Sequence, residues 1–289
     1  TNQSIRKVKG EINMLIKPEV YAPLVREKFE GKIKIGKMAV NLGYLSNTTV
    51  GETVTFPKWK LLSDATDVVK GTPIGTESLD QDSSTATIKM VAPKGTQIYD
   101  MDNLTMLGNA VNEAADQHGK IIARKLDADL IAEALTSPLK SATAGAKAIT
   151  GAELLTALTL YGDERDVSDF AGIVINSLLL PSFIGMTEFT SVEKTFNAQG
   201  NGIVEGGLVG YFLGIPVVMT DKGTYDATAQ ECITFIIKKN SLGYMTKRDI
   251  NTEEEREASY KRTTIYSDMI YAVKLLADDG IVVVRKTIV

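Results

Sequence analysis

The chain has 289 residues, of which 44% are hydrophobic and 24% charged, a balance that excludes a disordered protein and predicts one or two packed domains. Its net charge of −4 argues against a protein that holds nucleic acid tightly through phosphates, and its single cysteine excludes an internal disulfide. No apolar stretch approaches the roughly 18 residues that span a bilayer. We therefore expect no membrane association and synthesis in a cytoplasm.

The N-terminal region begins with a polar, basic segment, residues 1–17, which we interpret as an arm. We expect the start at Thr1 to reflect loss of an initiator methionine. Pro18 opens an amphipathic helix that continues to about Lys37. This helix could pack on its own domain or dock on a neighbouring molecule.

Two alternating segments predict a long β-hairpin. Glu52 to Trp59 places Val54 and Phe56 on one face, and Thr85 to Val91 has the same period of two. The intervening residues, 61–84, are too polar and too rich in glycine to build a core. A two-stranded ribbon is marginal in water, and no segment of the same chain is an obvious cover for it, so we expect its aromatic residues to form a contact surface.

A single long helix is predicted from Asp102 to Leu135, ending before Pro138. Its apolar residues recur at intervals of three and four, and at about 1.5 Å per residue it would be roughly 50 Å long. Such a helix is longer than a compact domain needs and resembles a spine. The apolar positions are Leu104, Leu107, Val111, Ala115, Ile122, Leu126 and Leu130.

An alternating α/β segment follows. Thr150 and Glu153 form a capping-box pattern for a short helix, and buried strands are predicted at Phe170–Asn176 and Cys232–Lys238. Two short strands flank a Gly-Ile-Pro turn within Tyr211–Met219. Residues 177–186 are expected to form a short helix or turn, and the glycine-rich residues 197–207 a loop.

The C-terminal region predicts further strands. Thr263 to Leu276 alternates loosely, and the β-branched run from Ile281 to Val284 follows a turn signal at Asp278–Gly280. We expect these strands to form a sheet with Thr96–Tyr99, with the spine helix lying across it.

The sequence predicts no catalytic residue, no cofactor and no metal site. His118 has no second histidine or cysteine to act with, and is expected to be satisfied by packing or solvent. The glycines near 206–214 do not open a helix after a strand, as a nucleotide loop would. Asp127 and Asp129 are interpreted as a solvated helix face, and Cys232 as a small buried hydrophobe.

The order of these elements resembles the tailed-bacteriophage major capsid proteins of the Hong Kong 97 (HK-97) type. The resemblance rests on the hairpin sequence Gly51-Glu52-Thr53-Val54-Thr55-Phe56-Pro57-Lys58-Trp59, the spine, the segment Gly210 to Val218, and the ending from Glu255 to Val284. It implies an α+β fold of four parts. These are an N-terminal arm (1–45), an extended loop (46–92), a peripheral domain with the spine (93–142 and 250–289) and an axial domain (143–249).

The resemblance also implies a function without catalysis. The chain would be a major head protein that self-assembles through pentamers and hexamers into an icosahedral shell around double-stranded DNA, without sequence-specific binding. It would be part of the virion, assembled in the host cytoplasm, with portal and possibly scaffold or decoration proteins as partners. The extended loop suggests inter-subunit contacts at Phe56, Lys58, Trp59, Lys60 and Lys70.

Two alternatives remain from the sequence. Encapsulins, which are bacterial protein compartments, share this fold and hold cargo enzymes instead of DNA. A soluble α/β enzyme is the other alternative, and it would require a pocket with convergent polar groups.

Overall fold

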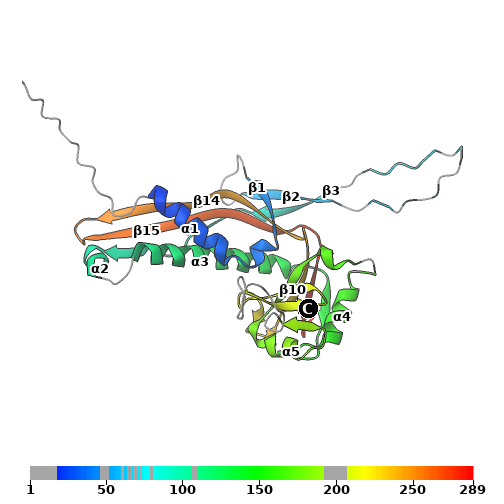
Figure 1. The fold of residues 1–289 in the computed structure, drawn as a ribbon. Coiled ribbons are helices and arrows are strands. Elements are labelled where there is room, and N and C mark those ends of the chain that lie inside the picture. The colour runs from blue at the N-terminus through cyan, green and yellow to red at the C-terminus, as the bar shows by residue number, and fades with distance from the viewer. Residues whose placement is uncertain are drawn as a thin grey trace, which may run out of the picture.

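A computed structural model describes most of the chain. The described residues are 18–45, 52–59, 62–63, 65, 67, 70–71, 73–78, 81–105, 110–163, 165–191 and 207–288. The predicted arm, 1–17, and nearly all of the predicted loop, 197–207, lie outside them. The molecule has an elongated body, from which a hairpin projects, and a compact lobe at one end of the body (Figure 1).

The body is built on a five-stranded sheet. Its centre is a long antiparallel pair, β14 (Leu242–Glu257) and β15 (Arg262–Leu275). Strand β1 (Val40–Tyr44) lies parallel to β14. Strands β4 (Lys89–Val91) and β5 (Thr96–Tyr99) both pair with β15, at different positions along it. The predicted pairing of Thr96–Tyr99 with the strand near 263–276 is confirmed.

Helices cover one side of this sheet. Helix α3 (Ala110–Ala134) runs along β15, and α1 (Pro18–Lys32) packs on α3 and β14 (Figure 1). A short 3₁₀ turn, η1 (Ile35–Lys37), follows α1. The predicted spine is confirmed over the 25 residues of α3, whereas its start is a separate short helix, α2 (Asp100–Thr105). Residues 106–109 lie outside the described part.

The lobe is built on a seven-stranded sheet in the order β6, β16, β13, β7, β10, β9, β8. Helix α4 (Gly151–Thr159) begins with the predicted capping box between Thr150 and Glu153. The 3₁₀ turns η2 (Val167–Asp169) and η3 (Ser177–Leu179), helix α5 (Leu180–Ile184) and a small strand pair, β11 (Tyr225–Asp226) with β12 (Glu231–Cys232), complete it. The sheet strands are β6 (Lys140–Ala142), β7 (Phe170–Ile175), β8 (Phe189–Ser191), β9 (Leu208–Phe212), β10 (Ile215–Met219), β13 (Thr234–Lys238) and β16 (Ile281–Arg285).

The predicted short strands around 211–219 are confirmed with one change. The turn between β9 and β10 is formed by Leu213 and Gly214, both of which have positive φ, and Pro216 lies inside β10 opposite Tyr211. Gly214 accommodates φ +86° without strain because it has no Cβ.

The predicted partner of the last strand was wrong. Strand β16 does not pair with Thr96–Tyr99 but lies between β6 and β13 in the lobe sheet. The reason is its burial: all four residues from Ile281 to Val284 are buried, so the strand needs cover on both faces. Ile281 and Val283 join one hydrophobic cluster, and Val282 and Val284 join another.

The two sheets share a core. The larger cluster combines α3 residues such as Leu126 with β15 residues such as Tyr271 and lobe residues such as Phe235. The second cluster lies between the other face of the lobe sheet and α4. The domain boundaries at 142, 143, 249 and 250 stay a prediction. The chain passes from the lobe sheet to the body sheet at residues 239–241, between β13 and β14, and returns to the lobe sheet at residues 276–280, between β15 and β16.

Close packing of α1 on α3 depends on Gly119. A Cβ at this position would lie 2.8 Å from the Val25 carbonyl oxygen and 2.9 Å from the Phe29 amide nitrogen. These are backbone atoms of α1, so they can move only if the whole helix shifts. The glycine therefore sets the distance between the two helices.

We expect Gly119→Ala to lower the free energy of unfolding by about 1–3 kcal/mol, because overpacking exceeds the gain in helix propensity. Gly31→Ala in α1 is the matched control, since a Cβ there meets nothing within 4 Å. The control should be neutral or stabilising by up to about 1 kcal/mol. Urea unfolding of the unassembled chain measures both, and equal effects would contradict the assigned role of Gly119.

His118 connects three elements of the body. Its ring nitrogens lie 2.8 Å from Thr96 Oγ1 and 2.9 Å from Ser267 Oγ, and its ring meets Tyr21 edge-on at 6.3 Å between centroids. The side chain is buried, so the prediction of a histidine satisfied by packing is confirmed. Burial lowers the pKa of this imidazole below its ordinary value of 6.5.

This shift has a defined consequence for stability. Because the unfolded chain binds a proton on His118 more readily than the folded chain, unfolding becomes easier as the pH falls below about 6.5, by up to about 1.4 kcal/mol per pH unit. Above about pH 6.5, where His118 is neutral in both the folded and the unfolded chain, its protonation does not lower the free energy of unfolding. We expect His118→Gln to flatten the dependence of unfolding free energy on pH between about pH 7 and pH 5. If the variant kept the parent's dependence of unfolding free energy on pH, the lowered pKa of His118 would be contradicted.

The interpretation of Asp127 and Asp129 as a solvated helix face was wrong. Both side chains are buried. Asp127 accepts hydrogen bonds from the backbone amides of Lys34 (3.0 Å), Ile35 (3.0 Å) and Gly36 (2.9 Å). Asp129 accepts 2.9 Å and 2.7 Å bonds from the Tyr271 hydroxyl and the Lys125 ammonium. These carboxylates attach η1 and β15 to α3.

Candidate assembly interface

Among the described residues, those of the hairpin extend furthest from the body (Figure 1). Strands β2 (Thr53–Trp59) and β3 (Gln81–Thr87) pair antiparallel in unbroken register, from Thr53 opposite Thr87 to Trp59 opposite Gln81. The predicted pairing is confirmed where the predicted second segment overlaps β3, at residues 85–87. Its other bounds were wrong, because Gln81–Ser84, predicted to belong to the polar tip, extends β3, whereas Lys89–Val91 forms β4 on β15. Beyond the paired strands the hairpin continues well away from the rest of the molecule (Figure 1).

The base of the hairpin is anchored within its own chain. Phe56 is 0% exposed and belongs to a small cluster between the hairpin and β15. Burial within its own chain argues against Phe56 as the predicted inter-subunit contact, and the expectation that nothing in the chain covers the hairpin fails at its base. The side chains buried with Phe56 are Ala86, Ile88, Ile270 and Ala272.

An ion pair also holds the base. The Lys58 ammonium lies 2.7 Å from Asp278 Oδ1, in the turn between β15 and β16. Lys58 is largely covered, whereas Asp278 is exposed, so the pair contributes modestly to stability but restrains the direction of the hairpin. Lys58 is thus occupied within its own subunit.

The other predicted contact residues lie further out. Lys70 is exposed in the turn at the tip, beside Gly71, whose φ is +92°. The Trp59 side chain and Lys60 lie outside the described residues. Within the tip, the Ser63 amide donates a 2.9 Å hydrogen bond to Glu77, which lowers the pKa of that carboxyl.

Several exposed apolar side chains were missed from the sequence. Ile74 at the hairpin tip is 74% exposed, and Met101 and Leu104 in α2 are 73% and 83% exposed. The prediction that Leu104 belongs to the buried stripe of the spine was wrong, because this residue lies in α2 and its side chain is exposed. Single exposed apolar residues are ordinary on protein surfaces, but these lie at the two extremities of the molecule.

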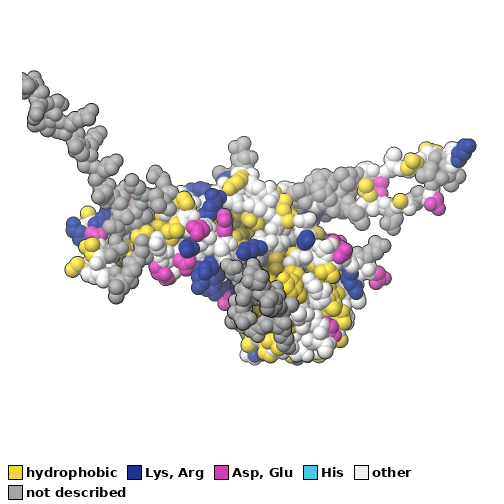
Figure 2. Space-filling view, in the orientation of Figure 1, with side chains coloured by type: hydrophobic (Ala, Val, Ile, Leu, Met, Phe, Trp, Pro, Cys, Tyr) yellow, Lys and Arg dark blue, Asp and Glu magenta, His cyan; other side chains and the backbone are white. Residues whose placement is uncertain are grey.

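Charge is distributed unevenly over the visible surface. Lys and Arg side chains gather in the middle of the molecule, where the body meets the lobe (Figure 2). Among the described residues, no three of His, Cys, Asp and Glu are arranged to hold a metal ion. Cys232 is buried as predicted, and burial raises the pKa of its thiol. The described helices are each too short or too polar to cross a membrane.

Comparison with solved structures defines the fold. The capsid structure of Cyanophage P-SCSP1u matches with a TM-score of 0.58 and 18% identity over 87% of each chain. A solved structure from Mycobacterium phage Adephagia matches with a TM-score of 0.59 and 15% identity over 89% of this chain and 91% of that one. The mature capsid of bacteriophage PhiM1 matches with a TM-score of 0.57 and 15% identity over 89% of this chain and 86% of that one. The fold is therefore HK-97-like, that of a capsid shell protein.

Sequence comparison identifies the family. No family model matches the chain. The major capsid protein of Staphylococcus phage phiMR11 is 30% identical over 286 residues, which cover 98% of this chain and 97% of that protein. The chain belongs to the family of phage major capsid proteins. This finding supports the phage capsid interpretation over the encapsulin and enzyme alternatives.

The base and the tip of the hairpin should respond differently to truncation. We expect Phe56→Ala to lower the free energy of unfolding by about 3–5 kcal/mol, because it opens a cavity between the hairpin and β15. The matched apolar truncation, Ile74→Ala, should change it by less than about 0.5 kcal/mol because the side chain is exposed. Urea unfolding of the unassembled chain measures both. A small effect at Phe56 would mean that the base is not anchored as described.

Proposed function

We propose that the hairpin tip of each subunit lies on a neighbouring subunit, and that identical chains close in this way into an icosahedral shell of pentamers and hexamers. The single observation that carries this proposal is the hairpin itself. Its base is anchored in its own chain, while its tip extends beyond every other described element. A two-stranded ribbon has no stable fold alone, so a neighbour is the natural cover.

The contact residues proposed for the interface are revised accordingly. Lys70, Trp59 and Lys60 remain candidates, and exposed Ile74 joins them at the tip. Met101 and Leu104 are candidates at the far end of the body. Phe56 and Lys58 instead fix where the hairpin points. Each contact is modest, and the closed shell gains stability by summing many identical ones.

Membership of the family supports the remaining parts of the proposal. The shell would enclose double-stranded DNA without sequence-specific contacts, have no catalytic activity, and be assembled in the host cytoplasm. Portal and possibly scaffold or decoration proteins would be its partners. The net charge of −4 supports retention of DNA mainly by confinement.

Shortening the hairpin tests the proposal. Residues 60–80 are replaced by Asn-Gly, which joins Trp59 to its partner Gln81 by a two-residue turn and preserves the register. We expect a folded subunit that forms no closed shells, measured by electron microscopy and light scattering. Its unfolding free energy should stay within about 1 kcal/mol of the parent, because the described residues among those deleted are all exposed.

Lys70→Gln is the control of full hairpin length, since it removes a charge at the tip but keeps the reach. It should still assemble, although less stably if Lys70 pairs with a neighbour. If the shortened variant assembled shells as resistant to denaturant as those of the parent, the hairpin would not be the link between subunits.

A further inference from the structure

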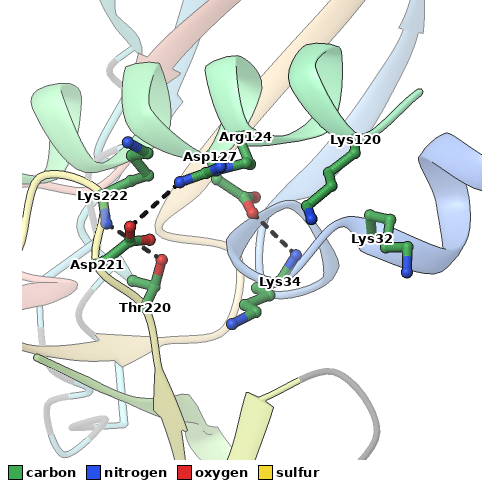
Figure 3. Close-up of a pocket in the computed structure, with 8 residues that line it drawn as sticks. All are labelled: Lys32, Lys34, Lys120, Arg124, Asp127, Thr220, Asp221 and Lys222. Atoms are coloured by element: carbon green, nitrogen blue, oxygen red, sulfur yellow. Dashed lines mark hydrogen bonds and ion pairs between the residues drawn. The ribbon is translucent and has the colours of Figure 1, made fainter. Parts of the chain in front are cut away.

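A cavity of about 320 Å³ lies where the body meets the lobe. Three segments that are far apart in sequence form its walls: the end of α1 with η1, the middle of α3, and the residues after β10. Figure 3 shows side chains from all three segments around this space, with the Lys120 ammonium directed toward it and the Lys32 ammonium directed away. The lining residues are Lys32, Lys34, Lys120, Arg124, Asp127, Thr220, Asp221 and Lys222.

The cavity carries an excess of positive charge. Five of its lining side chains are cationic and only two are acidic, in a chain whose net charge is −4. The Asp127 carboxylate is directed to the backbone amides of residues 34–36, so its hydrogen bonds go to the backbone and not to the ammonium groups of the cavity. Asp221 is 67% exposed and pairs with Arg124 at 3.2 Å. The two acids therefore do not neutralise the five cations.

Three of the cations have no acidic partner among the described residues: Lys32, Lys120 and Lys222. A fourth, Lys34, donates a 2.9 Å hydrogen bond from Nζ to the Met219 carbonyl oxygen, which fixes its charge at the wall. Like charges gathered around one concavity repel each other, and low-dielectric walls concentrate their field. An anion in the cavity would relieve this repulsion.

We propose that this cavity binds a phosphate group, held by Lys120 and Arg124 of α3 and by Lys222 after β10. A phosphate fits better than a single carboxylate because its several acceptor oxygens and higher charge match several ammonium donors and a guanidinium. The phosphate could belong to a DNA backbone, a source that rests on the proposed enclosure of DNA, or to a free phosphate or nucleotide. The site itself depends on neither.

The test titrates the full chain with inorganic phosphate by calorimetry. The pocket variant is Lys120→Gln with Lys222→Gln, two cations without an acidic partner in the described structure. The control is Lys89→Gln with Lys94→Gln, two exposed lysines outside the cavity that change the net charge equally. We expect parent and control to bind one phosphate per chain, and the pocket variant to bind it at least about fivefold more weakly. Equal midpoint temperatures of thermal unfolding for the parent and both variants exclude a folding defect.

Short duplex DNA added as a competitor distinguishes the sources. Displacement of phosphate by the duplex would assign a DNA backbone, and its failure would assign a free phosphate or nucleotide. The proposal is overturned if the parent binds no phosphate, if pocket and control variants weaken alike, or if only an acidic peptide occupies the cavity. Shell formation by the same variants is scored separately by electron microscopy, so a failure of assembly cannot be mistaken for a failure of the site.

Discussion

Strand β16 supplies side chains to both halves of the core, and the shape of the subunit depends on this double burial. Ile281 and Val283 pack with the cluster that contains α3 and β15, while Val282 and Val284 pack with the cluster beneath α4. Because successive side chains of a strand point to opposite faces, one short strand joins both clusters. The body and the lobe are therefore held together by continuous packing rather than by a flexible linker.

The hairpin differs from the rest of the subunit because the shared core covers so little of it. Most helices and strands of the body and lobe bury apolar side chains within the subunit, whereas the buried apolar side chains among the described hairpin residues, Phe56 and Ala86, lie at its base. The Lys58–Asp278 ion pair restrains its direction. A rigid body with one projecting arm suits repeated contact with identical copies, since the same arm can reach the same surface on each neighbour.

The sequence was informative where local rules decide the structure. Alternation predicted that β2 pairs with a second strand but placed that strand at 85–91 instead of 81–87, and the Thr150–Glu153 pattern predicted the start of α4. Spacing of apolar residues predicted α3 but extended the stripe wrongly to Leu104. In each case the signal lies within a few residues along the chain.

Long-range partners were not readable in this way. A run of β-branched residues identifies β16 as a strand but does not say which sheet receives it. Asp127 and Asp129 lie near basic residues in the sequence, a pattern typical of a solvated helix face. Their actual partners, the amides of η1 and the Tyr271 hydroxyl, are distant in sequence and meet them only in the folded chain. For the same reason the lysines of the basic cavity, 32, 34, 120 and 222, could not be grouped from sequence.

The central claim is that the tip of the hairpin finds its cover on another copy of the chain. An electron cryo-microscopy reconstruction of the assembled purified chain tests this most directly. We expect closed shells in which Lys70 and Ile74 contact a neighbouring subunit while Phe56 stays buried in its own. The claim would be contradicted by shells in which the tip folds back on its own body, or by a chain that stays monomeric at every concentration and salt tested, even with a scaffold protein present.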